Sequence, residues 1–250
     1  MKSFRETEVM NIFDEMGVYW AEIADQNQTE AQLKFLKTQL KPDGYVLDLA
    51  CGTGRHSIPL SQQGLNMVGL DVSANLLKIA KMHGRGVQLV RGDMRFLPFR
   101  SEAFTAAVSM DTSFGYLPSE SDDAQSLREL RRVLKQAGAV IVDVFNRQNL
   151  TAKYHGKNQT PKSREYTSFF LQQSRTVIGN GDWLCDSWTV RDKAGGQTKI
   201  FEHTVRLYDP TKLRGLLEKA SFAVKKVYGG YEAENFDPDS PRLIVAAYAK

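Results

Sequence analysis

Short apolar runs alternate with helical patterns of apolar and polar residues in the first half of the chain. The runs are typical of buried strands and cover residues 45–50, 67–71, 87–90, 105–110 and 139–145. Helical spacing fits residues 55–63, 74–82 and 121–136 between them. Each helical stretch precedes a glycine that can end it in a left-handed conformation: Gly64, Gly84 and Gly138. This alternation predicts an α/β fold with a mostly parallel sheet and helices on both faces.

An N-terminal region of different pattern precedes this core of residues 45–146. Residues 4–40 look helical with a break near Gly17, and Thr29 with Gln32 forms a capping-box pattern for the second helix. The pattern of residues 1–44 therefore predicts a helical arm, which either packs on the core or covers a ligand as a lid. Tyr19 and Trp20 are the candidate lid residues; ligand contact and packing weigh about evenly for Tyr19, and packing slightly more for Trp20.

The pattern changes again after Asn146. Residues 147–165 are polar and irregular, and β-like runs separated by hairpin signals follow at residues 166–178, 183–191 and 197–208. Residues 147–208 thus predict a three-stranded antiparallel insertion.

Residues 209–250 return to the main sheet. Asp209 and Pro210 open a helix, and the runs 222–228 and 242–249 predict two strands, one of them antiparallel to the rest. The whole chain is expected to be a single domain with a seven-stranded sheet plus the insertion.

Composition adds few constraints. Apolar residues make up 42% and charged residues 25%, which is ordinary for a soluble globular protein, and no run is apolar enough for a leader peptide or a membrane span. Cys51 and Cys185 form no metal-binding pattern, so no metal is expected and a reducing cytoplasm is the simplest location. The formal net charge is +4, and the insertion carries the excess, with ten Lys or Arg against five Asp or Glu.

The stretch VLDLACGTG at residues 46–54 carries the main functional signal. A strand that runs into a glycine turn and a helix brings backbone N–H groups close to a nucleotide-bearing ligand. Asp71 ends the next apolar run, where an acid can hold ribose hydroxyls. The turn alone suits dehydrogenases and methyltransferases equally, although the third glycine of the dehydrogenase pattern falls on Ser57.

The methyltransferase interpretation explains more of the chain. It accounts for Asp48 before the turn, for Gly92-Asp93-Met94 after the third strand, and for Met110-Asp111 after the fourth. In these residues the chain resembles the class I S-adenosylmethionine-dependent methyltransferases. The resemblance spans residues 45–146 in the family's order and spacing and rests on five stretches: 48–54, 69–73, 92–94, 110–114 and 130–138. Ala50 departs from the usual first glycine of the turn, and Gln136-Ala137 departs from the usual Pro-Gly.

The resemblance implies a Rossmann-like sheet and S-adenosylmethionine as cofactor, with S-adenosylhomocysteine as product. It places Asp48 near the cofactor's ammonium group, Asp71 on both ribose hydroxyls and Asp93 at the adenine edge, although Asp48 as a capping acid and Asp93 as a turn residue are structural alternatives. The implied cofactor-binding set is Tyr19, Asp48, Ala50, Cys51, Gly52, Gly54, Asp71, Val72, Gly92, Asp93, Met94 and Met110.

The methyl acceptor has no motif of its own. Direct displacement needs mainly alignment, a hydroxyl acceptor also needs a base, and no residue is marked as that base. The fourth strand ends in Met-Asp-Thr-Ser-Phe, not in the family's Asn-Pro-Pro-Tyr-type signature, which counts against methylation of DNA adenine. The acceptor candidates are Phe114, Tyr116, Asn146, Arg147, Tyr166, Trp188 and His203.

Two of these candidates have a strand pattern of their own. His203 alternates with Phe201 and Val205, so a satisfied core histidine outweighs a ligand contact by roughly two to one. Trp183 and Trp188 have opposite parity on one strand and cannot both face a ligand.

The predicted function is methyl transfer to a nitrogen or oxygen of a small molecule. The insertion is expected to cover the acceptor and set substrate choice, as in several small-molecule methyltransferases. RNA modification is the rival, with the positive insertion on phosphates, although nucleic acid is not favoured because the charge excess is small. A non-catalytic module that only holds the cofactor is the third interpretation. No membrane partner is expected.

Overall fold

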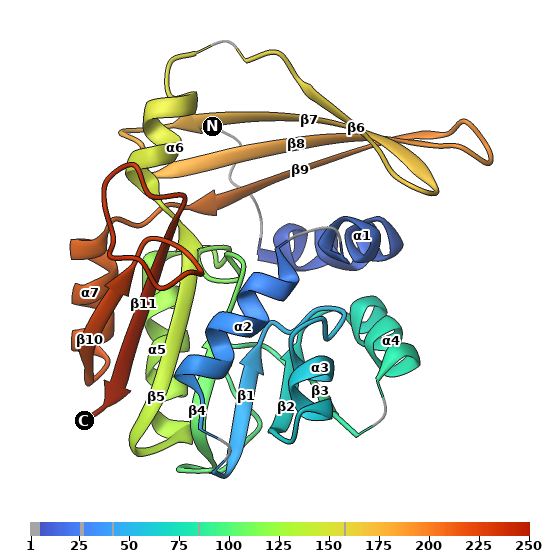
Figure 1. Cartoon of the computed structure of the whole chain (residues 1–250). Helices are drawn as coiled ribbons and strands as arrows, with labels where there is room; N and C mark the ends of the chain where they lie inside the picture. Colours follow the sequence, from blue (N-terminus) through green and yellow to red (C-terminus); the bar gives the residue numbers. More distant parts are fainter. Residues whose placement is uncertain (1–5, 26–27, 42, 85, 158) are drawn as a thin grey trace.

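The computed structural model describes residues 6–25, 28–41, 43–84, 86–157 and 159–250 and contains two β-sheets (Figure 1). The larger sheet has seven strands, in the order β10 (Phe222–Tyr228), β11 (Arg242–Ala249), β5 (Leu134–Phe145), β4 (Phe104–Ser109), β1 (Tyr45–Leu49), β2 (Asn66–Asp71) and β3 (Gln88–Arg91). Strands β1 to β5 are parallel, and β11 runs antiparallel to both of its neighbours. The predicted Rossmann-like α/β sheet is therefore confirmed.

Helices cover both faces of this sheet because successive strand residues point to opposite sides. Leu47 and Leu49 of β1 pack in one cluster with α5 (Glu120–Val133) and α7 (Pro210–Lys219). Val46, the residue before Leu47, packs in the other cluster with α2 (Thr29–Gln39) and α3 (Ser57–Gln62). α4 (Ala74–His83) packs near the edge strand β3. No helix in the described ranges is long and apolar enough to cross a membrane.

The second sheet is antiparallel and has four strands, not the three predicted. Its order is β6 (Lys162–Glu165), β7 (Phe169–Ile178), β8 (Trp183–Asp192) and β9 (Thr198–Arg206), and α6 (Arg147–Tyr154) leads into it. All four residues of β6 are exposed, so the strand lacks the apolar alternation by which a strand is recognised in sequence. Figure 1 shows this sheet across the end of the large sheet toward which β1 points.

The second sheet is joined to the core by a buried ion pair. Asp123 of α5 is fully buried and accepts hydrogen bonds from the Arg206 guanidinium at the end of β9 and from the Tyr208 hydroxyl, the latter at 2.5 Å. Burial raises the pKa of Asp123 to about 6, against the lowering effect of Arg206 and Tyr208. We call these three residues the interlayer joint.

Helix α1 (Glu6–Asp25) lies between the two sheets (Figure 1). It kinks at Gly17, which has φ 22° and ψ −98°, as the predicted break requires. The Asp14 carboxylate accepts hydrogen bonds from Ser73 Oγ at 2.7 Å and Asn75 N at 2.9 Å, at the start of α4. Beyond the kink, Glu22 accepts one from Ser168 Oγ at 2.6 Å, beside β7. The arm is thus attached to both layers.

Several predicted helix ends differ from the structure. The position before α2 is held by Gln28 without a side-chain cap, so the capping box predicted at Thr29 is wrong: Thr29 Oγ1 and Gln32 Oε1 instead accept hydrogen bonds from Arg55. Gly64 is left-handed as predicted, with φ 94°, whereas Gly84 is extended.

Gly138 also differs from its prediction, because it lies inside β5 and the left-handed residue there is Ala137. A Cβ on Gly138 would approach Lys135 O to 2.8 Å, so the glycine serves a close backbone approach and not a helix end.

Candidate active site

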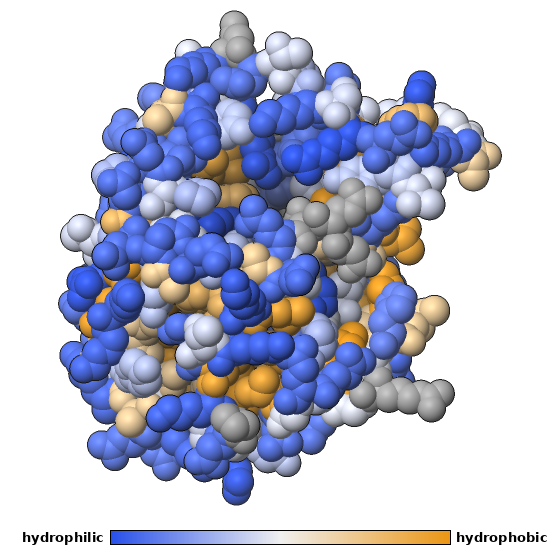
Figure 2. Space-filling model, viewed as in Figure 1, coloured by the Kyte–Doolittle hydropathy of each residue, from blue (hydrophilic) through white to orange (hydrophobic). Residues whose placement is uncertain are grey.

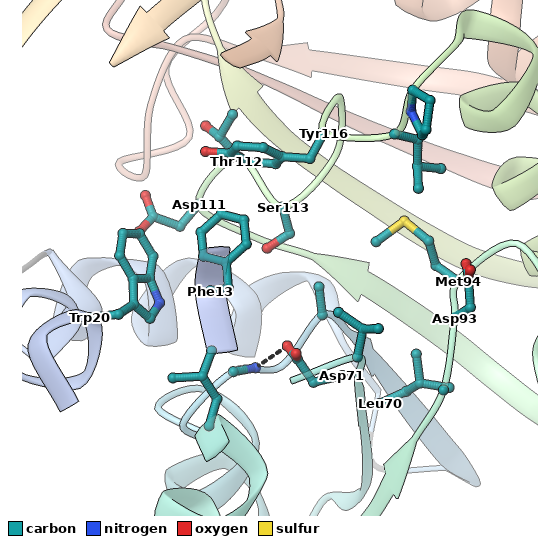
Figure 3. A pocket seen from close by; sticks show the side chains of 17 residues that line it. Phe13, Trp20, Leu70, Asp71, Asp93, Met94, Asp111, Thr112, Ser113 and Tyr116 are labelled. Atoms are coloured by element: carbon teal, nitrogen blue, oxygen red, sulfur yellow. Dashed lines mark hydrogen bonds between the residues drawn. The ribbon is translucent and has the colours of Figure 1, made fainter. Parts of the chain in front are cut away.

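A cavity opens where the parallel strands end, and we call it the strand-end cavity (Figure 3). Carboxyl ends of parallel strands meet at one edge of a sheet, so short segments after β1, β2, β3 and β4 all reach it. Helix α1 adds Phe13 and Trp20 from the opposite side. Of the cofactor-binding residues predicted from the sequence, the cavity brings together Ala50, Gly52, Asp71, Val72, Gly92, Asp93 and Met94.

The turn after β1 gives this cavity a wall of main chain. Ala50, Gly52 and Gly54 all have positive φ, at 60°, 54° and 74°. Ala50 thus holds a left-handed conformation that glycine adopts more easily, which explains why glycine is usual there. A Cβ on Gly52 would find its first neighbours only at 3.9–4.0 Å, whereas one on Gly54 would meet Ile58 Cδ1 at 2.9 Å. Gly52 therefore keeps the cavity open, and Gly54 permits the following helix to pack closely.

Asp71 is fixed by the main chain around it. Its Oδ2 accepts a hydrogen bond from Gly52 N, drawn dashed in Figure 3, and its Oδ1 accepts one from Ser73 N, both at 2.8 Å. Burial raises the pKa of Asp71, and these backbone N–H groups partly oppose the rise. Each oxygen keeps a free lone pair, so the carboxylate can accept two further hydrogen bonds from a ligand.

Asp93 lies on another side of the same cavity, beside Met94 (Figure 3). Arg95 donates to it from the backbone at 2.8 Å and from its guanidinium at 2.6 Å. Burial would raise the pKa of Asp93, but the hydrogen bonds from Arg95 outweigh it and hold the pKa below its usual value. The carboxylate is therefore ionised and oriented near neutral pH.

Four predicted cofactor contacts are placed behind the wall and are not among the described lining residues: Asp48, Cys51, Gly54 and Met110. Asp48 is 1% exposed and accepts a hydrogen bond from Ser57 Oγ at 2.5 Å, at the start of α3. Burial raises the pKa of Asp48 to about 6. Met110 packs in the apolar cluster under α2. These residues support the turn without reaching the cavity in this structure.

Tyr19 faces away from the cavity in this structure, so its role as a cofactor contact stays a prediction. Its hydroxyl donates to Asp192 at 2.8 Å and its ring packs edge-on against Phe169 at 5.1 Å, in the second sheet. Neighbouring helix residues point about 100° apart, so Trp20 takes the cavity side instead. Phe13, on the other side of the kink at Gly17, also lines the cavity.

Strained backbone marks the end of β4. Asp111 and Thr112 have φ of 52° and 64°, which non-glycine residues rarely adopt, and such strain is common at functional sites. Asp143 of β5 stabilises the conformation: its carboxylate accepts from Asp111 N at 2.8 Å and its carbonyl from Thr112 N at 2.9 Å. The Asp111 carboxylate itself is held by Arg55 Nη2 at 2.8 Å and has Arg242 Nη1 4.0 Å away.

A second cavity adjoins the first, between the two sheets, and we call it the interlayer chamber. Trp20, Asp111 and Tyr116 line both spaces. Figure 2 shows the surface hollowed below the antiparallel sheet, with hydrophilic residues around the hollow. Of the predicted acceptor contacts, the chamber brings together Tyr116, Tyr166, Trp188 and His203. Sequence reasoning missed its charged members, which are Arg164, Arg175, Asp186 and Arg242.

Aromatic rings surround the junction of the two spaces. Trp20 stacks on Trp188 with ring centroids 5.6 Å apart, and His203 lies 5.8 Å from Tyr116 and 6.0 Å from Phe13. Burial lowers the pKa of His203, so its imidazole is neutral at pH 7. Its Nδ1 has no hydrogen-bond partner within the described residues. His203 is therefore buried as the alternation predicts, yet it borders a cavity.

The remaining acceptor candidates do not line the chamber in the described structure. Phe114 is 1% exposed inside the main core. Asn146 caps α6 and donates to Ser240 O at 2.8 Å, while Arg147 pairs with Asp182 at 3.1 Å. Core packing holds Phe114, and local hydrogen bonds and ion pairs hold Asn146 and Arg147, so the role of these three residues as acceptor contacts stays a prediction.

Comparison with known protein families places the chain's core in one of them. A family model described as a methyltransferase domain matches residues 46–138. The uncharacterized protein MJ1252 of Methanocaldococcus jannaschii is 36% identical over 201 residues, which cover 78% of this chain and 68% of that protein. A glycine/sarcosine N-methyltransferase of Parasynechococcus marenigrum is 36% identical over 160 residues, covering 60% of this chain and 56% of that enzyme.

Solved structures share the fold over the whole chain. The CcbJ methyltransferase of Streptomyces caelestis superposes with a TM-score of 0.81 at 17% identity, covering 99% of this chain and 100% of that one. At this identity the likeness concerns the fold. The chain spans only about half the length of several curated relatives that it matches, between 43% and 47%.

Proposed function

Because this chain belongs to the class I S-adenosylmethionine-dependent methyltransferases, we propose that it methylates a nitrogen or oxygen of a small molecule bound in the interlayer chamber. The observation that carries the proposal is the shared wall. Trp20, Asp111 and Tyr116 line both the strand-end cavity and the chamber, so a ligand in either space would contact the same three side chains. Methyl transfer needs this arrangement, because the acceptor atom must lie in line with the methyl group.

The strand-end cavity fits S-adenosylmethionine in its own residues. Asp71 offers two free lone pairs for the two ribose hydroxyls, and its neighbours Val72 and Met94 offer apolar surface for the adenine. The turn around Gly52 leaves room for the methionyl part beside the main chain. When bound, the cofactor supplies a methyl group activated on its sulfonium.

The residues of the chain then provide alignment and proton acceptance. Trp20 and Trp188 stack on each other and give the junction an aromatic wall. The Asp111 carboxylate, held by Arg55, accepts a hydrogen bond from an acceptor amine or hydroxyl. The neutral imidazole of His203 borders the same space and can take a proton from a hydroxyl acceptor. The P. marenigrum relative acts on amines by its name, which supports nitrogen as the acceptor.

The test is to incubate the protein with methyl-labelled S-adenosylmethionine and a fractionated cell extract. We expect label in the fraction of small molecules. An Asp71→Ala variant, compared with an Asp43→Ala control in the exposed turn before β1, should lose the labelling. Label found in the RNA fraction instead would favour the rival function, and label in neither fraction would count against catalysis altogether.

A further inference from the structure

The charges around the interlayer chamber are almost completely paired. On the core side, Asp111 and Asp143 face Arg55 and Arg242, with Asp143 Oδ1 accepting from Arg242 Nε at 2.8 Å. This group has two carboxylates and two guanidiniums and is neutral.

The antiparallel sheet contributes a second neutral group. Asp186 is 3% exposed and accepts hydrogen bonds from Arg175 Nε at 2.9 Å, Gln173 Nε2 at 2.8 Å and Trp188 Nε1 at 2.7 Å. His203, directly across the ladder from Asp186, adds no charge because burial lowers its pKa.

Arg164 is the exception. It lines the chamber from β6, and its guanidinium forms no ion pair or hydrogen bond with any other residue that the structure describes. It pairs across the ladder with Leu171, which also lines the chamber, so Arg164 lies on the sheet face turned toward the core. Among the described lining residues it leaves one uncompensated positive charge, at the exposed rim.

An acceptor that carries one negative charge would neutralise this chamber. A carboxylate matches the charge, whereas a phosphate dianion would leave an excess negative charge. A guanidinium also holds a carboxylate through two parallel hydrogen bonds, which fixes the orientation of the molecule. With its carboxylate at the rim, the other end of the acceptor points to Asp111 and Tyr116, where the two spaces meet.

We propose that the methyl acceptor is an amine that also bears a carboxylate, and that Arg164 binds this carboxylate while Asp111 faces the amine. The inference rests on the proposed function, because it identifies the class of molecule that the chamber receives. It adds the anionic group and the residue that selects it.

The labelled product tests this inference directly. The small molecule that the full-length protein labels in the extract is isolated, and half of it is esterified with acidic methanol. We expect the esterified half to gain the mass of a methylene group for each carboxylate. A labelled product without this gain would overturn the carboxylate inference and leave methyl transfer standing. If no small molecule is labelled, the proposed function fails and the inference fails with it.

Variants of Arg164 test the residue, using the acceptor so identified. Arg164→Gln should raise the KM for the acceptor about tenfold or more and leave the KM for S-adenosylmethionine unchanged, because a charge-assisted pair is lost. Arg164→Lys keeps the charge but not the paired hydrogen bonds, so an intermediate KM is expected. The matched control is Arg191→Gln, an exposed arginine next to Val190 that points to the outer face of the sheet. An unchanged KM in Arg164→Gln would overturn the assignment.

Discussion

The strand-end cavity and the interlayer chamber touch each other but are built in opposite ways. The strand-end cavity takes most of its wall from one continuous part of the chain, residues 50–118, and fixes its acids through backbone N–H groups and a neighbouring residue. The chamber takes side chains from residues 20 to 242 and fixes them through ion pairs between neighbouring strands. A site built from main chain suits a cofactor that many proteins share. A site built from side chains can change from one protein to the next, together with the acceptor that it binds.

The largest expected effect concerns the strand-end cavity alone. Asp71→Ala should weaken the binding of S-adenosylhomocysteine about a hundredfold or more, since two charge-assisted hydrogen bonds contribute roughly 3 kcal/mol or more. Isothermal titration measures the affinity, and thermal melting checks that the variant folds. Asp43→Ala, at the other end of β1, should bind normally. An affinity within threefold of the parent protein would contradict the assignment of this cavity to the cofactor.

Asp48→Asn tests a residue that lies behind the strand-end cavity and affects the stability of the fold. A buried carboxyl with a pKa of about 6 binds a proton more tightly folded than unfolded, so stability falls as pH rises from about 4 to about 6. Asparagine does not ionise, so the variant does not lose stability in this way. Its free energy of unfolding should exceed that of the parent protein by up to about 3 kcal/mol at pH 7 and by almost nothing at pH 4. Urea unfolding of the ligand-free protein at both pH values measures this. A gain that is equal at the two pH values would show that the ionisation of Asp48 is not the cause.

Substitution of Trp20 tests whether the strand-end cavity and the interlayer chamber function independently. Because it lines both, Trp20→Ala should lower kcat/KM about tenfold and also weaken cofactor binding, through lost packing with Trp188. Steady-state kinetics with each substrate varied in turn measures both effects. Val18→Ala is the control, since Val18 is 69% exposed on the same helix. If the kinetic parameters change for only one of the two substrates, Trp20 serves only one of the two cavities.

This contrast also explains what could be predicted from the sequence. The periodicity of strands and helices predicted the large sheet. The residues after each strand, such as Asp71 and Asp93, predicted most of the strand-end cavity, because strand ends converge in any parallel sheet. Tyr19 was predicted in place of Trp20 because the rotation of α1 depends on what it packs against, and that partner is the second sheet.

The chamber could not be predicted in this way. Arg164 and Asp186 are separated along the chain, belong to different strands, and have ordinary surroundings in sequence. Only the register of the antiparallel sheet turns them to the same face. β6 was itself missed, because an exposed polar strand carries no apolar period, and Arg164 was lost with it.

The interlayer joint has a consequence for how such proteins can be recombined. Asp123 belongs to the core, yet its charged donor Arg206 is the last residue of β9, and its second donor Tyr208 follows two residues later. A second sheet transplanted from a relative without an equivalent of Arg206 would leave a buried carboxylate unpaired, at a cost of about 3–5 kcal/mol. Exchange of acceptor specificity by grafting this sheet therefore has to carry residue 123 of the core along with it. The boundary of the exchangeable unit runs through helix α5 and not through the loops that join the two sheets.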